Sequence, residues 1–386
     1  MWRFLSLLAA STIAAALSGC AYVDSVSSRY DNVNRNAAYA RNQSILLNIV
    51  RSSENAPLNF VAFSRVTTNT SASASAGLPA FVLGPSPVPE YLGRDATFSD
   101  KALSGSTGVS NSMDLTILDS HDFYTALLNP VDLPTLTYFI QQGYSRELLF
   151  RLFTDSVRMQ VGASSLEFRN EPNAPCYDFH GVQFCFDDML YNAIGAGLTA
   201  ETRLEANTKS NPKKLILGRL CFDPVLAARA LHHYPRRFFS KMLARPAQHR
   251  PICGKGAWRR QTLNGTPDTL TFELPHTRYG PIHFRIVTRS TFAIYQYLGR
   301  LLAEGKQREV HVERRGDEAN DVTQLLEVST GAATDCFVET AYRGQNYCVP
   351  ERAAYTKKIF SLLAQLIALK TQTSDLAVLP TVRVTP

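Results

Sequence analysis

Seven cysteines are the residues of this 386-residue sequence whose type and spacing most directly suggest chemistry. Cys20 lies near the N-terminus, and the other six form three neighbouring pairs along the chain, Cys176 with Cys185, Cys221 with Cys253, and Cys336 with Cys348. The first and third pairs bracket strand–turn–strand patterns, and the open end of a hairpin can bring two cysteines to the ~5.5 Å Cα separation of a disulfide. We therefore predict three intramolecular disulfides, each stabilising the fold by about 2–4 kcal/mol. Six cysteines allow other connectivities, and the sequential one rests on this geometry.

Cys20 ends a stretch that is typical of an export signal. Arg3 gives a positive start, residues 4–17 are apolar, and Leu17-Ser18-Gly19-Cys20 places small residues before the cysteine. This stretch is too short to span a membrane and predicts a signal peptide over residues 1–19. Its ending resembles the lipobox of bacterial lipoproteins, which implies acylation of Cys20, and Ala21 resembles the form sorted to the outer membrane. The alternative is an ordinary signal peptide with an incidental cysteine.

Familiar catalytic and metal-binding motifs are absent from the sequence. It contains no Gly-x-Ser-x-Gly, His-Glu-x-x-His, Cys-x-x-Cys or Walker-type pattern. His232 and His233 are adjacent, so on a helix their side chains would point about 100° apart, which suits ligation of one ion poorly. We therefore expect no metal, no cofactor and no enzymatic activity. A periplasmic hydrolase of unrecognised type is an alternative, because the members of a catalytic triad can lie far apart in sequence.

The basic segment, residues 224–267, is the most uneven part of the charge distribution. It carries nine Lys or Arg residues and no Asp or Glu, in a chain whose net charge is +7. Such a concentration of cations attracts anionic partners. In an exported chain these are lipid headgroups, acidic polymers or acidic proteins, so we expect no nucleic acid. A solvated basic face is the alternative. The candidate contacts are Arg236, Arg237, Lys241 and Arg245.

The chain between the last two cysteines offers a second candidate contact. Gly344 can supply the positive φ that a tight hairpin turn needs. A rigid tip that displays Tyr342, Arg343 and Tyr347 would have the composition of an interaction hot spot. The alternative is an ordinary hairpin closed by a disulfide.

The elements that must position these residues mix helices with hairpins. Residues 59–76 and 107–118 alternate in polarity and predict two long strands around a Gly/Pro-rich insert, residues 77–105, although a flexible linker is an alternative. Because hairpins outnumber strand–helix repeats, we predict an α+β fold with antiparallel sheet hairpins and packed helices. The predicted helices are 41–54, 145–157, 187–206, 224–243, 288–303 and 353–369. Further strands are expected at 167–170, 176–186, 213–217, 268–274, 281–287, 308–313, 336–349 and 376–384.

These elements give the expected organisation of the chain. A signal peptide over residues 1–19 and a lipidated tether over residues 20–40 precede the folded body. Residues 41–160 hold a first helix, the long strand pair with its insert and a helical block. Residues 161–386 form a disulfide-containing α+β region. The composition, with 45% hydrophobic and 19% charged residues, suits such a folded body.

Several segments add a resemblance through their order along the chain. They are Arg41-Asn42-Gln43-Ser44-Ile45-Leu46-Leu47-Asn48-Ile49-Val50-Arg51, Leu127-Leu128-Asn129-Pro130 with Gln141-Gln142-Gly143-Tyr144, Thr288-Arg289-Ser290 with Tyr295-Gln296-Tyr297-Leu298-Gly299, Tyr342-Arg343-Gly344-Gln345-Asn346-Tyr347, and residues 356–366. Together they resemble an uncharacterised family of Gram-negative outer-membrane lipoproteins. The resemblance implies an outer-membrane location and brings no established activity.

We therefore expect a non-enzymatic outer-membrane lipoprotein, anchored through the lipid on Cys20 and facing the periplasm. It would be a structural or interaction component that binds a protein or an anionic envelope partner. A carrier of lipids or small molecules is a further alternative, which predicts a deep apolar pocket.

Overall fold

The computed structural model describes residues 26–75, 104–179, 182–204, 216–230, 252–254, 269–277, 280–305, 309–311, 322–331, 334–371 and 381–384. The predicted signal peptide and most of the predicted insert lie outside these residues. The chain divides into two compact units, of which one comprises residues 1–37, 60–118 and 373–386 and the other residues 38–59 and 119–372. None of the described helices has the length and apolarity needed to cross a bilayer.

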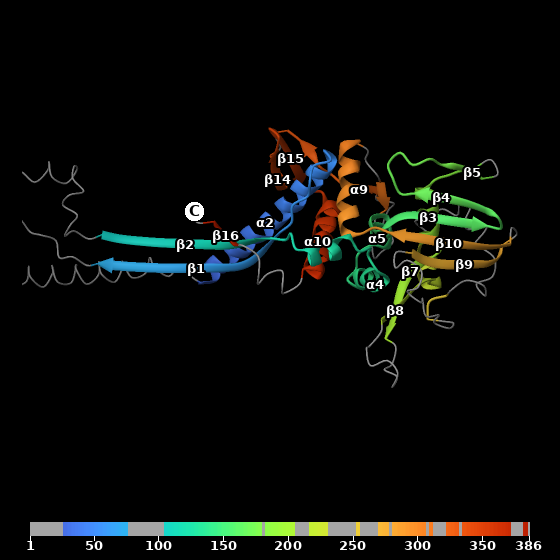
Figure 1. The fold of residues 1–386 in the computed structure, drawn as a ribbon, viewed down its shortest axis with the longest axis horizontal. Helices are drawn as coiled ribbons and strands as arrows, with labels where there is room; N and C mark the ends of the chain where they lie inside the picture. Colours follow the sequence, from blue (N-terminus) through green and yellow to red (C-terminus); the bar gives the residue numbers. More distant parts are fainter. Residues whose placement is uncertain are drawn as a thin grey trace, which may run out of the picture. The chain divides into compact units, whose positions relative to one another are not determined.

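The strands of the first unit form one antiparallel sheet. β1 (Val61–Ser75) pairs with β2 (Ser104–Ile117) along its whole length, with an irregularity between Phe63 and Arg65. β16 (Thr381–Val384) adds a third strand beside the start of the ribbon, at Met113–Thr116 of β2 (Figure 1). The prediction of two long strands is confirmed, and a flexible linker is wrong for these residues.

Helix α2 (Val26–Ser53) begins before the predicted start at Arg41, so the later part of the predicted tether is helical. Its predicted apolar stripe is confirmed: Ile45, Leu46, Ile49 and Val50 are all buried. Asn48, inside α2, exchanges two hydrogen bonds with the backbone of Asn59, at 2.7 and 3.0 Å, and so holds the chain that follows the helix against it.

The second unit is built around a four-stranded antiparallel sheet (Figure 1). Its order is β4 (Ser164–Arg169), β3 (Thr154–Val161), β10 (Gly280–Thr288) and β9 (Thr269–Thr277). β3 alternates between buried residues such as Val157 and Met159 and exposed residues such as Arg158, which is the pattern of a sheet with one solvated face. The expected boundary between residues 160 and 161 therefore falls inside a paired strand.

Smaller antiparallel sheets complete this unit and confirm the α+β class. They are β5 (Tyr177–Phe179) with β6 (Val182–Phe184), β7 (Leu198–Leu204) with β8 (Ile216–Phe222), β11 (Glu309–His311) with β12 (Val322–Gln324), and β13 (Ser329–Thr330), β15 (Gln345–Pro350) and β14 (Cys336–Tyr342) in that order.

Side-chain caps set the starts of several helices. Ser120, Asp132, Ser145 and Ser290 each accept a hydrogen bond from a backbone N–H in the first turn of the helix that follows. These helices are α3 (His121–Leu128), α4 (Leu133–Gln141), α5 (Arg146–Phe153) and α9 (Thr291–Ala303). α10 (Ala354–Lys370) packs against α9 and contributes buried residues such as Ile359, Phe360 and Leu363 to the core.

Two predicted helices are too long. The helix expected over 145–157 ends at Phe153, where β3 begins, and the one expected over 187–206 is α6 (Phe186–Gly195) followed by β7. Gly197 separates α6 from β7 with a φ of 92°, and a Cβ there would lie 2.2 Å from the carbonyl oxygen of Asp223. Glycine is therefore required for both the backbone conformation and the close approach.

Candidate functional site

The predicted site residues are divided between the described and the undescribed parts of the chain. Cys20 and the four candidate contacts of the basic segment, Arg236, Arg237, Lys241 and Arg245, lie outside the described residues. The other six cysteines and the residues Tyr342, Arg343 and Tyr347 lie within them. The structure can therefore place the start of the basic segment, residues 252–254 within it, and the hairpin tip.

All six of these cysteines form the disulfides expected from the sequence. The Cα–Cα separations are 4.3 Å for Cys176–Cys185, 5.1 Å for Cys221–Cys253 and 5.6 Å for Cys336–Cys348. In the last hairpin the register sets Cys348 opposite Glu339 and Cys336 opposite Pro350, so the bond joins the strands diagonally.

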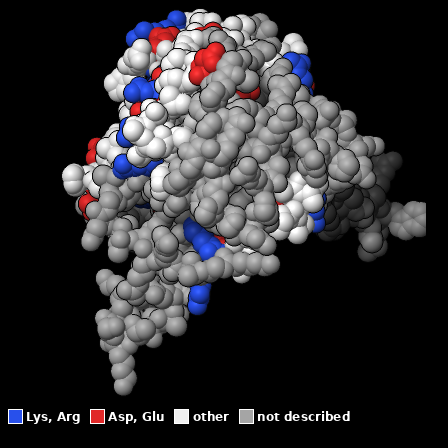
Figure 2. Space-filling model, turned by 90° about the vertical axis from the view of Figure 1, so that its right-hand side faces the viewer, with Lys and Arg blue, Asp and Glu red and all other residues white. Residues whose placement is uncertain are grey.

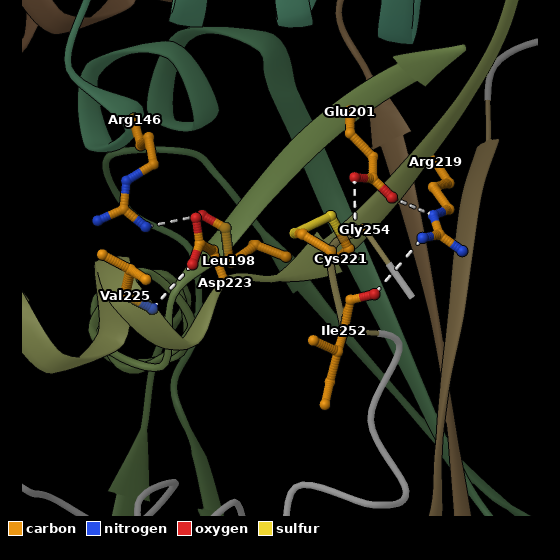
Figure 3. The surroundings of a disulfide bond; sticks show 10 residues. Arg146, Leu198, Glu201, Arg219, Cys221, Asp223, Val225, Ile252 and Gly254 are labelled. Atoms are coloured by element: carbon orange, nitrogen blue, oxygen red, sulfur yellow. Dashed lines mark hydrogen bonds and ion pairs between the residues drawn. A yellow bond between two sulfur atoms is a disulfide. The ribbon is translucent and has the colours of Figure 1, made fainter. Parts of the chain in front are cut away.

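The disulfide Cys221–Cys253 ties β8, just before the basic segment, to Cys253, which lies within that segment (Figure 3). Cys221 lies on β8, and Asp223 follows this strand immediately before the segment. The Asp223 carboxylate accepts a 2.8 Å hydrogen bond from the amide of Val225, in the first turn of α7 (Pro224–Ala230). On the return, the amide of Cys253 donates to the carbonyl of Phe222 at 3.3 Å. The two ends of residues 224–252, which hold six of the nine cations, are therefore attached to the same hairpin.

A salt bridge strengthens this junction (Figure 3). Glu201 on β7 accepts from the Arg219 guanidinium on β8 and from the amide of Gly254 at 2.9 Å, and Arg219 also reaches the carbonyl of Ile252 at 3.4 Å. Sequence reasoning missed this arrangement because residues 198–204 were assigned to a helix. The alternation in Leu198-Thr199-Ala200-Glu201 was the signal that could have revealed it.

The same junction groups atoms that could ligate a metal ion, since atoms of Glu201, Cys221 and Cys253 lie within 4.8 Å of one another. The two sulfur atoms are, however, joined to each other, and the carboxylate is hydrogen-bonded to Arg219 and Gly254. All three candidate ligands thus have structural partners.

The tip of the β14–β15 hairpin is a two-residue turn in which Arg343 and Gly344 both have positive φ, 49° and 79°. This is the combination of a type I′ turn, which matches the twist of the flanking strands. The Arg343 side chain is 67% exposed, lies over the ring of Tyr342 and forms a 2.7 Å ion pair with Glu54, which follows α2. The guanidinium is therefore held in place while much of it faces solvent.

Tyr347 does not belong to an exposed tip, because it is only 6% exposed. β15 is the central strand of its sheet, with Thr330 of β13 on one side of Tyr347 and Thr340 of β14 on the other. Burial, the Glu54 carboxylate and Tyr342 together raise the pKa of the Tyr347 hydroxyl. Tyr347 therefore supports the hairpin from within, and the short strand β13 that covers it was not predicted.

The most strongly buried charges of the second unit surround the end of α5. The Arg289 guanidinium is fully buried, stacks 3.9 Å from the centre of the Tyr297 ring and donates to the carbonyls of Arg151 at 3.2 Å and Leu152 at 3.3 Å. The backbone amide of Arg289 donates to the carbonyl of Phe153 at 2.6 Å. These acceptors belong to the last turn of α5, whose carbonyls have no partner within the helix. The cluster therefore ends α5 and positions β3.

Arg151 is the second arginine of this cluster. It forms ion pairs with Glu147 at 3.2 Å and with Asp187 at 2.6 Å. Burial acts against its charge, but the pKa of Arg151 is raised because Asp187, Tyr297 and Glu147 outweigh that effect. The pairing joins α5 to the first turn of α6, which is a structural role.

Over the described residues of the face in Figure 2, Lys and Arg are interspersed with Asp and Glu. Such a mixed surface gives little attraction for one sign of charge.

Comparisons with protein-family models, curated proteins and solved structures found no match to this chain.

Proposed function

We propose that this protein is a non-enzymatic outer-membrane lipoprotein whose basic segment binds an anionic partner in the bacterial envelope. The observation that carries the proposal is the pairing of the cysteines. Six close three disulfides, and the one that is left, Cys20, ends the predicted signal peptide.

The disulfides support export, because they persist mainly in oxidising compartments. A thiol acylated more than once holds a protein on a membrane almost irreversibly, since each buried CH₂ contributes about 0.8 kcal/mol. With Cys20 as the attachment point, the folded units would stand beside the membrane in the periplasm.

The basic segment supports the binding role. Its nine cations are unaccompanied by acidic residues, so their fields add over the Debye length of about 8 Å at physiological salt. Cys221–Cys253 and the Glu201–Arg219 ion pair hold the two ends of residues 224–252, which carry six of these cations, and this lowers the entropy lost when they bind. Arg343 is a second candidate contact, with Tyr342 beneath it.

The binding role is tested by reversing the charge of Arg236, Arg237, Lys241 and Arg245 to Glu. Intact envelopes that contain the wild type or this variant would be crosslinked, and the partners recovered by affinity purification. The matched control reverses four exposed cations elsewhere, Arg35, Arg41, Arg203 and Lys358, and so changes the net charge equally.

We expect the recovered amount of the anionic partner to fall at least tenfold with the first variant and to stay unchanged with the control. Retention of the same partners by both variants would show that the basic segment is only a solvated face. Equal loss in both would mean that net charge, and not this segment, drives the association.

A further inference from the structure

The β1–β2 ribbon has edges to which no strand is paired among the described residues. In the order β1-β2-β16, β1 is an edge strand along all of Val61–Ser75. β16 covers only Met113–Thr116 of β2, so no described residue pairs with the second edge of β2 from Ser104 to Ser112 (Figure 1).

These edges are long. At about 3.3 Å per residue, β1 extends about 50 Å. Along an antiparallel edge roughly every second residue directs its N–H and C=O groups away from the existing partner. The ribbon therefore offers two rows of backbone donors and acceptors on which a further strand could pair.

The side chains of the ribbon add little to its own stability. Residues 66–75 and 104–112 consist only of Ser, Thr, Ala, Gly, Asn and Val. Cross-strand pairs of large apolar or oppositely charged side chains are what stabilise a sheet, and an isolated two-stranded hairpin is at best marginal in water. Pairing with further strands would add the stability that these small residues cannot give the ribbon.

The same residues also lack the features with which proteins protect an edge. Residues 66–75 and 104–112 contain no Pro and no charged residue, and Arg65 opposite Asp114 is the first charged pair met toward the start of the ribbon. Edges without Lys, Pro or inward charges are open to pairing with another chain. The repeated small polar residues also specify register weakly, which favours such pairing.

We propose that the open edges of this ribbon pair with those of other copies of the same chain. Two uncharged ribbons approach without repulsion, whereas an acidic or a basic partner would find no complementary charge along residues 66–75 and 104–112. Every copy brings edges of matching length, so each can give and receive a strand. This self-association is independent of the envelope partner proposed above.

The test compares three full chains in mild detergent at micromolar concentration, with native mass spectrometry as the readout. In the first variant Asn-Gly replaces residues 69–110, which leaves the pairs from Thr68 with Asn111 to Val61 with Ile117 and keeps the site of β16. In the control Asn-Gly replaces residues 76–103, so that both strands are retained and only the connection between Ser75 and Ser104 is shortened. Two-residue Asn-Gly loops favour hairpin turns.

We expect masses of two or more chains for the wild type and the control, and the mass of one chain for the shortened ribbon. A wild type of single-chain mass, or a shortened ribbon with the wild-type mass, would overturn the proposal. The three disulfides, mapped in each variant, report whether the second unit is intact.

A charge pair gives a second readout that does not depend on deletions. Thr68, Thr70 and Ala72 become Lys in one variant and Glu in another. Each variant alone should have the mass of one chain, and mixing the two should restore complexes that contain both. If each stays associated alone, or if the mixture forms no mixed complex, the ribbons do not pair.

Discussion

Arg289 acts as the C-terminal cap of a helix that is remote in the sequence. Helices commonly end with glycine, but α5 ends in Arg151-Leu152-Phe153-Thr154, which contains none. The carbonyls of its last turn are instead satisfied by the guanidinium and amide of Arg289. The side chain of Asn170 adds bonds of 2.6 Å to the carbonyl of Arg151 and 2.8 Å to that of Thr154.

Replacing Arg289 with Leu should therefore lower the free energy of unfolding by about 3–5 kcal/mol, because the buried carbonyls of Leu152 and Asn170 would lose the guanidinium donor. Arg300→Leu is the matched control, since that side chain is 43% exposed and forms one ion pair, with Glu171. It should cost no more than about 1 kcal/mol. Urea unfolding of both variants measures the difference, and equal costs would contradict the capping role.

Tyr347 gives the structure a dependence on alkaline pH. The native state holds the Tyr347 proton more tightly than the unfolded chain does, because its pKa is raised above the usual value of about 10. The contribution of this group to the free energy of unfolding is fully present below about pH 10 and is lost as the pH rises through the raised pKa. Tyr347→Phe has no such proton, so its free energy of unfolding should fall less between pH 8 and 11 than that of the wild type. Parallel profiles would contradict this assignment.

At the scale of elements, local signals predicted much of the fold. The alternation of β1 and β2 and the apolar stripe of α2 are patterns of neighbouring residues, and both predictions are confirmed. The disulfides were predictable for the same reason, because two of the three close short hairpins.

The errors arose where distant residues decide the structure. The apolar pattern of α5 continues into β3, and the residue that ends the helix is Arg289. The strand β13, which covers Tyr347, has only two residues and no pattern of its own. In β7 the local signal existed, since Gly197 marks the end of α6, but the helix was extended through it.

Two glycine substitutions test the placement of β7 after α6. Gly197→Ala would force alanine into the positive φ of this position and bring its Cβ against the Asp223 carbonyl. At Gly162, which also has a positive φ, of 57°, a Cβ would meet nothing within 4 Å. We expect Gly162→Ala to cost about 1–2 kcal/mol and Gly197→Ala to cost about 1–3 kcal/mol more. Thermal unfolding compares the two variants. Equal losses would show that residues 195–198 do not pass beside Asp223.

At the scale of the whole molecule, the structure shows which of the described candidate contact residues are exposed to a partner. Of the hairpin residues, Arg343 remains exposed and Tyr347 does not. Composition could suggest this tip, but the exposure of each residue depends on the sheet that the hairpin joins. Residues 224–252 of the basic segment gain a fixed attachment at Cys221–Cys253 that composition alone could not reveal.

The segments that carry the family resemblance also have structural roles in the second unit. Arg289 caps α5, and its carbonyl accepts a 2.9 Å hydrogen bond from Val131, just after Pro130. Asn48 holds the backbone of Asn59 beside α2.

Attachment of lipid to Cys20 is the most direct test of the account, because location, orientation and the choice of partner all depend on it. Cells expressing the wild type, Cys20→Ala or the double variant Cys176→Ala/Cys185→Ala would be labelled with an alkynyl fatty acid and fractionated. We predict label and outer-membrane recovery for the wild type and the double variant, and neither for Cys20→Ala. Label that survives in Cys20→Ala, or a wild type that takes up none, would contradict the account.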